Sequence, residues 1–290
     1  MSSELPVRKT YKLYIGGEMV RTESGRSDPI YSPRPKKALL ANVSRGSRKD
    51  VRDAVGKARG AHDGWAKKTG YLRGQILYRM AEMLEGRAES FEKILRESRG
   101  LSPAAARREA RASIDRIVHY AGWSDKFGAL LSTVNPVASS YYDFSVPEPT
   151  GVVGVVAPET PELLGLVTYL APVIVSGNAA VVLLSERHPL AGLELGEVLA
   201  TSDLPAGVAN LISGRKEELV PHLARHMDVN AICDAGGDAA LSKAIAQDAA
   251  VNVKRVKRYA VHDNLAGAAQ GLEFIEAFVE TKTTWHPVGV

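Results

Sequence analysis

The stretch GVVGVVAPETPELLGLVTYLAPVIVSGNAAVVLLSERHPLAGLELGEVL, residues 151–199, decides the fold prediction for this chain. Two short runs rich in valine, 151–157 and 179–184, alternate with longer apolar segments of helical length. Short apolar runs bounded by glycine and proline are typical of buried strands. Strands that alternate with helices form parallel sheets covered by those helices. The stretch therefore predicts a β-α-β-α unit.

The same alternation continues on both sides of this stretch. Apolar runs at 207–212 and 229–235 predict two further strands, separated by a helical segment. Toward the N-terminus, YKLYIGGEMVRT (11–22) alternates apolar and polar residues around two glycines, which predicts a hairpin. Helical spacing of apolar residues follows over about 47–127, with Ser47 as the first N-cap. The predicted fold class is α/β, a Rossmann-like, helix-flanked, mostly parallel sheet with an N-terminal helical layer.

Composition is that of an ordinary globular protein. Hydrophobic residues make up 45% of the 290 residues and charged residues 24%, which argues against extensive disorder. The formal net charge of +4 is too small to indicate nucleic-acid binding without a concentrated basic patch. The run KRVKR (254–258) is such a candidate, but a strand would place its cations on both faces. We predict an edge strand protected by charge; the alternative is an interface for an acidic partner.

Three features favour the cytoplasm. The one cysteine, Cys233, excludes an internal disulfide and fits a reducing compartment. The opening MSSELPVRKT has no apolar region of the kind a secretory signal needs. The apolar segment LLGLVTYLAPVIV (163–175) is too short to span a membrane and contains Pro172, so we expect a core helix and no membrane association.

No metal site is predicted. His222 and His226 have the i, i+4 spacing of two ligands on one helix face, but no third ligand follows at a useful distance. Asp234 and Asp238 are too few carboxylates for a closed cation site. Asp238 is better explained as the N-cap of the next helix.

Several motifs together resemble the aldehyde dehydrogenase family. KLYIGGEMV (12–20) resembles the family's first hairpin, and EPTGVVGVVAPETPELL (148–164) is similar to its E-P-x-G-V-V-G-x-I-x-P-W-N-x-P-L. The segments 170–189 and 204–214 resemble its A-P-A-L-A-A-G-N-x-V-V-x-K-P-S-E and L-P-x-G-V-x-N-x-V-x-G. The resemblance covers roughly the first 255 residues and implies the cofactor-binding domain of such an enzyme.

Compared position by position, the resemblance implies that residues of the family's catalytic and cofactor sites are replaced in this chain. Thr160, preceded by Glu159, stands where the family has the asparagine that helps to stabilise the oxyanion, and Leu183 replaces its ribose-binding lysine. The phosphate-facing turn reads DAGGD around Gly236, so two aspartates would compete with a pyrophosphate. Tyr259 replaces the general-base glutamate. The domain that carries the nucleophilic cysteine has no counterpart, so no catalytic residue is predicted and Cys233 is expected to be a buried structural thiol.

Cofactor binding would depend on what remains of the family pattern. Ser185 and Glu186 match the family pattern and are the predicted contacts for an NAD ribose. We expect no resident cofactor. NAD is the cofactor that the resemblance would allow. The sequence itself has no G-x-G-x-x-G fingerprint.

The C-terminal segment predicts a strand that takes part in subunit assembly. FVETKTTWHPVGV (278–290) resembles the C-terminal strand of the degenerate, non-catalytic module of class 16 type aldehyde dehydrogenases. In the family, such a strand and the one near YYDFSVPEP (141–149) form an arm that adds to a neighbouring subunit's sheet. Four aromatic residues are candidate interface contacts, with packing inside the chain as the alternative: Tyr141, Tyr142, Phe144 and Trp285.

These expectations divide the chain into four parts. The hairpin and helical layer take residues 1–136, the oligomerisation arm strand 137–150, the Rossmann-like part 151–270, and the C-terminal helix and arm strand 271–290. The favoured function is a catalytically inactive subunit that joins a full-length active aldehyde dehydrogenase or copies of itself. The alternatives are an NAD-binding oxidoreductase component whose partner supplies the cysteine, and a module that senses a nucleotide or metabolite.

Overall fold

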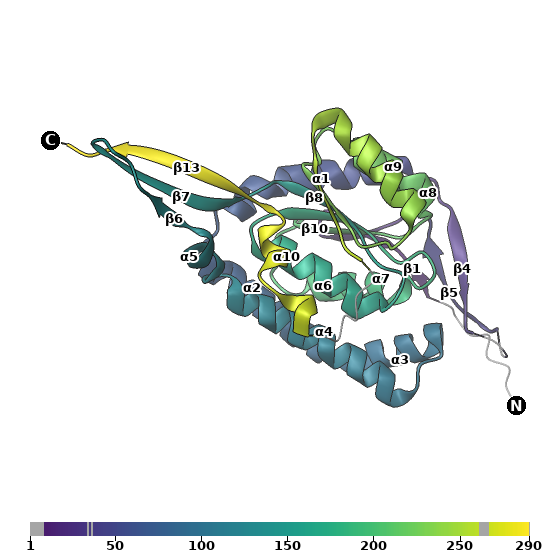
Figure 1. The fold of residues 1–290 in the computed structure, drawn as a ribbon. Helices are drawn as coiled ribbons and strands as arrows, with labels where there is room; N and C mark the ends of the chain where they lie inside the picture. Colours follow the sequence, from purple (N-terminus) through teal and green to yellow (C-terminus); the bar gives the residue numbers. More distant parts are fainter. Residues whose placement is uncertain (1–8, 34, 36, 261–266, 290) are drawn as a thin grey trace, which may run out of the picture.

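A seven-stranded sheet forms the centre of the molecule, with strand order β12-β11-β8-β9-β10-β2-β3 (Figure 1). The structure is a computed structural model that describes residues 9–33, 35, 37–260 and 267–289. The strands of this sheet are β2 (Leu13–Ile15), β3 (Glu18–Val20), β8 (Val152–Val156), β9 (Ala179–Leu183), β10 (Ala209–Ile212), β11 (Ala231–Asp234) and β12 (Arg255–Arg258).

The five C-terminal strands of this sheet are parallel, and the N-terminal hairpin extends it. β2 pairs antiparallel with β10 and with β3. The turn between β2 and β3 is Gly16–Gly17, and both glycines have positive φ, a conformation that other residues rarely adopt. The predicted hairpin and the α/β fold class are confirmed. β12 lies at the sheet edge, as the charged run predicted.

Helices cover both faces of the sheet. One face carries α1 (Arg48–Ala66), α8 (Lys216–Arg225) and α9 (Ala239–Ala249), and the other carries α6 (Glu162–Val175) and α7 (Leu190–Ala200). An outer layer packs on α6 and α7 and consists of α2 (Gly70–Glu85), α3 (Ala88–Arg99) and α4 (Pro103–Trp123). Most of the predicted N-terminal helical layer therefore packs on α6 and α7 and not on the sheet. Its first helix, α1, packs directly on the sheet.

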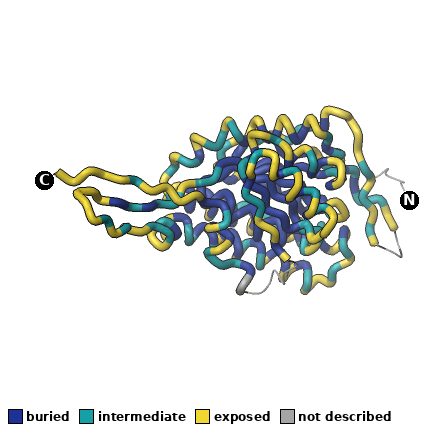
Figure 2. Tube along the Cα trace, turned by 45° about the horizontal axis from the view of Figure 1, so that its top comes forward, coloured by how far each residue is buried: buried dark blue, intermediate teal, exposed yellow. Residues whose placement is uncertain are grey.

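The core consists of two apolar clusters, one on each side of the sheet. Along β8, Val153 and Val155 belong to the cluster under α6, whereas Val152 and Val156 belong to the cluster under α1. This is the alternation that a strand buried on both faces requires. Figure 2 shows the buried chain concentrated in these central layers and the exposed chain along the outer helices and the projecting strands.

Local sequence signals explain how two central helices are placed. The side chain of Ser47 accepts from the backbone N–H groups of Lys49 and Asp50, and the Asp50 carboxylate accepts from the N–H of Ser47, which completes a capping box for α1. The segment 163–175 forms α6 and is buried throughout, as the sequence predicted for a core helix. No helix in the described part of the chain is long and apolar enough to cross a membrane.

A second sheet projects from the body as an arm, with strand order β13-β7-β6 (Figure 1). It consists of β6 (Thr133–Asn135), β7 (Tyr141–Pro149) and β13 (Val279–Pro287), and β13 pairs with β7 over all nine residues. The arm thus includes β6, which lies N-terminal to the boundary expected at residue 137. The remaining elements are β1 (Thr10–Tyr11), β4 (Ser27–Tyr31), β5 (Leu39–Ser44), α5 (Phe127–Leu131), η1 (Ala250–Asn252), η2 (Gly267–Gln270) and α10 (Glu273–Glu276).

A short C-terminal segment ties the arm to the body. On this segment Phe274, Ile275 and Phe278 are buried, and α10 packs against α6. At the root of the arm, the Asn178 amide donates to the carbonyl of Phe278 at 2.8 Å and accepts from the N–H of Gly151 at 2.7 Å. The predicted span 151–270 includes residues 261–266, which lie outside the described residues.

Candidate functional site

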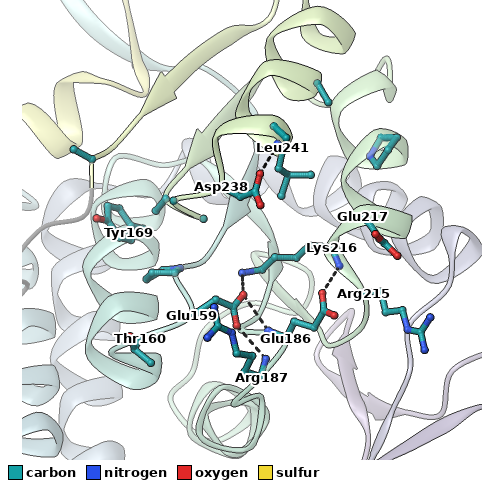
Figure 3. Close-up of a pocket in the computed structure, with 18 residues that line it drawn as sticks. Glu159, Thr160, Tyr169, Glu186, Arg187, Arg215, Lys216, Glu217, Asp238 and Leu241 are labelled. Atoms are coloured by element: carbon teal, nitrogen blue, oxygen red, sulfur yellow. Dashed lines mark hydrogen bonds and ion pairs between the residues drawn. The ribbon is translucent and has the colours of Figure 1, made fainter.

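A cleft of about 1070 Å³ opens at the carboxyl ends of the parallel strands (Figure 3). Ligands of open α/β sheets bind at this edge, because the loops that follow the strands converge there. The loop after β8 contributes Glu159 and Thr160, and the loop after β9 contributes Glu186 and Arg187. Most of the remaining wall comes from α8, the turn before α9 and α9 itself.

The polar centre of the cleft is an ion pair between Glu159 and Lys216. The Lys216 ammonium contacts Oε1 of Glu159 and donates to the carbonyl oxygen of Ala157 at 2.7 Å. The side chain of Glu159 is only 20% exposed and that of Lys216 only 8%. Burial alone would raise the pKa of Glu159, but Lys216 and the hydrogen bonds to the carboxylate outweigh burial and hold the pKa below its ordinary value.

The loop after β9 also binds the Glu159 carboxylate. Oε2 accepts from the Ser185 hydroxyl at 2.9 Å and from the N–H of Arg187 at 3.0 Å, and Oε1 accepts from the N–H of Glu186 at 3.3 Å. The charge of Glu159 is therefore neutralised by contacts within the protein.

The predicted cofactor contacts are engaged in the same network. Ser185 is buried and bound to Glu159. Glu186 lines the cleft, but its carboxylate accepts from the N–H of Lys216 at 2.9 Å, at the start of α8. The Ser185 hydroxyl is thus engaged within the protein, whereas Glu186 is exposed and uses one carboxylate oxygen to bind α8. The NAD contacts remain a prediction.

The four positions at which the sequence was predicted to depart from the family's motifs lie in different surroundings. Thr160 is exposed and lines the cleft, and Gly236 lines the cleft as well. Leu183 is buried in the cluster under α1 and does not line the cleft. Tyr259 is also buried, and its ring stacks on Phe274 at 4.9 Å and lies 5.0 Å from the ring of Tyr169.

The two aspartates of the DAGGD turn behave differently. Asp238 lines the cleft and caps α9, because its carboxylate accepts from the N–H of Leu241 at 2.8 Å. Asp234 is buried and accepts from the Ser242 hydroxyl and from the N–H of Gly236. The expectation that both carboxylates face a pyrophosphate was therefore wrong for Asp234, since the end of β11 turns it into the protein.

Lys216 was not among the residues predicted for a site. One signal was available: the lysine lies just past the end of the predicted parallel strand 207–212, where the loops of an α/β sheet place their functional side chains. What could not be read from the sequence was its partner, 57 positions away. In the described part of the chain, no group of three or more His, Cys, Asp or Glu side chains could hold a metal ion.

The four predicted interface residues all lie on the arm, in two pairs. The Tyr141 and Trp285 rings lie 5.8 Å apart, and those of Tyr142 and Phe144 lie 5.6 Å apart. Tyr141, Tyr142 and Trp285 are 46%, 48% and 57% exposed. They contact one another and are still about half exposed to solvent, so packing inside the chain is only partial and the interface stays a prediction.

The register places the two pairs on opposite faces of the arm. Tyr142 and Phe144 are two residues apart on β7 and share one face. Trp285 pairs with Asp143, which shares the other face with Tyr141. A partner that contacts only one face of the arm therefore reaches one pair and not the other.

Comparison with known proteins places these features in a family. Residues 19–259 match the model of the aldehyde dehydrogenase family. The chain is 30% identical over 280 residues to an aldehyde dehydrogenase of Aspergillus niger, covering 96% of this chain and 54% of that protein. It is 32% identical over 251 residues to the betaine aldehyde dehydrogenase of Bacillus subtilis (strain 168), covering 84% and 49%.

Solved structures agree on the fold. HpcC from Thermus thermophilus superposes with a TM-score of 0.82 at 26% identity, covering 87% of this chain and 48% of that one. A point mutant of an aldehyde dehydrogenase from Bacillus cereus gives 0.81 at 25% identity, covering 87% and 51%. The chain thus spans about half the length of the relatives it matches.

Proposed function

Because this chain belongs to the aldehyde dehydrogenase family, we propose that it is a non-catalytic member that acts as a structural or regulatory subunit of an aldehyde dehydrogenase assembly. Its partner in this proposal is a full-length active aldehyde dehydrogenase or a second copy of this chain. The protein resembles the non-catalytic module of class 16 type members in its C-terminal strand.

The observation that carries the proposal is the packing of Tyr259. This residue stands where the family resemblance places the general base, directly after β12. Burial against Tyr169 and Phe274 raises the pKa of its phenol far above the ordinary value, so the group stays neutral at any physiological pH. A neutral phenol in an aromatic cluster does not accept a proton as the family's carboxylate would.

The one thiol of the chain is equally unsuited to catalysis. Cys233 lies inside the central sheet with no exposed surface. Burial, and then the neighbouring Asp234 carboxylate, raise its pKa well above the ordinary value. Since the thiolate is the attacking species, this cysteine cannot form a covalent intermediate with an aldehyde in the folded protein.

The projecting arm supports a role in assembly. Its aromatic residues are exposed on both faces, and tyrosine and tryptophan are enriched in protein interfaces. The outer strand β13 pairs on one side only in the described structure, which leaves a nine-residue edge that another strand could extend. A partner that adds a strand here would also cover the neighbouring aromatic side chains.

The proposal is tested by the mass of the purified chain and of its mixture with a full-length aldehyde dehydrogenase from the same cells. We expect multi-angle light scattering at micromolar concentration to show an assembly rather than a monomer. Serine at Tyr142 and Phe144, or at Tyr141 and Trp285, should weaken that assembly. Tyr71→Ser is the matched control, because this tyrosine is 67% exposed on α2, away from the arm.

Two outcomes would contradict the proposal. A monomer in every mixture would remove the assembly role, and equal masses for the arm variants and the control would remove the arm as the contact. An increase in melting temperature with NAD would favour the alternative instead, an oxidoreductase component that binds NAD while a partner supplies the cysteine. We expect no such increase, because the Ser185 hydroxyl is already bound to Glu159 and the lysine of the family pattern is replaced by the buried Leu183.

A further inference from the structure

The Glu159 carboxylate lies among hydrogen-bond donors and a cation that come from two other parts of the chain. The loop after β9 supplies the hydroxyl of Ser185 and the backbone N–H groups of Glu186 and Arg187, and the start of α8 supplies the ammonium of Lys216. Convergent N–H groups with a lysine are a common arrangement for holding a carboxylate or a phosphate. Here the anion they hold is a side chain of the same protein.

The donors are held in place without Glu159. Lys216 is bound through its ammonium to the carbonyl of Ala157 and through its N–H to the Glu186 carboxylate. The Ser185 hydroxyl also accepts from the N–H of His188 at 3.0 Å, which fixes the turn that presents the two backbone donors. The donor set is therefore organised by contacts that would remain if the Glu159 side chain were absent.

The site is also within reach of solutes. Lys216, Glu186 and Arg187 line the open cleft, and the Glu159 side chain is 20% exposed to it (Figure 3). Glu159 itself extends from the loop after β8, a different segment from the donors.

We infer that the cleft contains an anion-binding site occupied by Glu159, and that a free carboxylate or phosphate group binds there when this side chain is removed or displaced. In the wild type, the tethered carboxylate has a high effective concentration and outcompetes small free anions. The site is closed by the protein's own side chain, and this closure is independent of how the arm assembles.

Glu159→Ala with added acetate tests the inference directly, because acetate replaces the atoms that the substitution removes. We expect the variant to melt at a lower temperature than the wild type, and acetate to raise that temperature saturably, as binding to the native state requires. Inorganic phosphate, tested in parallel, distinguishes a site for carboxylates from one for oxyanions in general. Acetamide, the neutral isostere, should not rescue, and the wild type should show no saturable response to acetate.

Two control variants assign the effect to this site. Adding Lys216→Met to Glu159→Ala removes the cation and should abolish the rescue. Glu217→Ala removes an exposed carboxylate from the same cleft and should respond to acetate no more than the wild type. The inference is wrong if Glu159→Ala responds no more than these controls.

If the alanine variant does not fold, Glu159→Gln tests whether the protein holds Glu159 as an anion. The pKa of Glu159 is lowered in the folded state, so its contribution to stability is present above the unfolded pKa and is lost as pH falls through the folded value. The variant should therefore be less stable than the wild type at neutral pH, and the difference should disappear at acidic pH. A difference that does not change with pH would show that Glu159 is not held as an anion, and would overturn the inference.

Discussion

Glu162→Gln should make the protein more stable than the wild type at alkaline pH and should remove a pH dependence from its unfolding. Glu162 is the first residue of α6, and its side chain is only 1% exposed. The neighbouring groups are the Arg99 guanidinium at 3.1 Å, the Ser98 hydroxyl and the second buried carboxylate, Glu109. Glutamine keeps the size of the side chain and cannot ionise.

The magnitude follows from the pKa of this carboxyl. Burial, only partly offset by Arg99, raises the pKa of Glu162 from 4.5 to about 8. A group that binds its proton more tightly in the folded state contributes stability that is complete below the unfolded pKa and is lost as pH rises through the folded value. Because one pKa unit corresponds to about 1.4 kcal/mol, ionisation of Glu162 removes roughly 4 to 5 kcal/mol between about pH 4.5 and 8.

Urea unfolding of both proteins at several values between pH 5 and pH 9 measures this contribution. We expect the free energy of unfolding of the variant, minus that of the wild type, to increase by several kcal/mol across this range. Arg99 keeps a partner in the variant, because it also contacts Glu109 at 2.6 Å.

Glu82→Gln is the control for this experiment. Glu82 is an exposed carboxylate that pairs with Arg79 on α2, so its removal should leave the pH profile unchanged. If the difference between Glu162→Gln and the wild type is the same at pH 5 and pH 9, Glu162 is ionised in the folded protein like an ordinary glutamate and the reasoning is refuted.

Four further predictions concern stability and reactivity. Cys233 should not react with a thiol reagent at pH 8 until denaturant unfolds the protein, because it is buried and its pKa is raised; fast reaction of the native protein would contradict this. Asn178→Ala should lower the free energy of unfolding by about 2 to 4 kcal/mol in urea, since it leaves the N–H of Gly151 and the carbonyl of Phe278 buried without this partner. Tyr259→Glu should lower the melting temperature at neutral pH rather than restore activity, because the carboxylate would be buried among aromatic rings. Ser47→Ala should cost about 1 kcal/mol in urea unfolding through loss of the α1 cap, and an unchanged midpoint would show that the cap does not contribute.

Features that depend on neighbours in sequence were predictable for this chain. The strands and helices of residues 151–199 follow from the spacing of their apolar residues. The hairpin at Gly16–Gly17 and the caps at Ser47 and Asp238 follow from local backbone chemistry, which acts over a few residues. The burial of Cys233 follows from its place in an apolar strand.

The candidate site depends instead on contacts between distant segments. The sequence showed a carboxylate at Glu159 but could not show that Lys216 neutralises it, since the pair forms only when the sheet brings the loops after β8 and β10 to the same edge. The same holds for the aromatic residues of the arm. Their types indicated an interface, but the register between β7 and β13 decided which of them share a face.

The sequence by itself therefore determined the α/β class and the family, and it predicted the positions that depart from the family's motifs. Only the tertiary structure decided what these residues contact: Glu159 pairs with Lys216 and Ser185, Asp234 turns into the protein and Tyr259 joins an aromatic cluster. The physical reason is that charge and hydrogen-bond partners act through space over a few ångströms, whereas the chain places those partners tens to hundreds of residues apart.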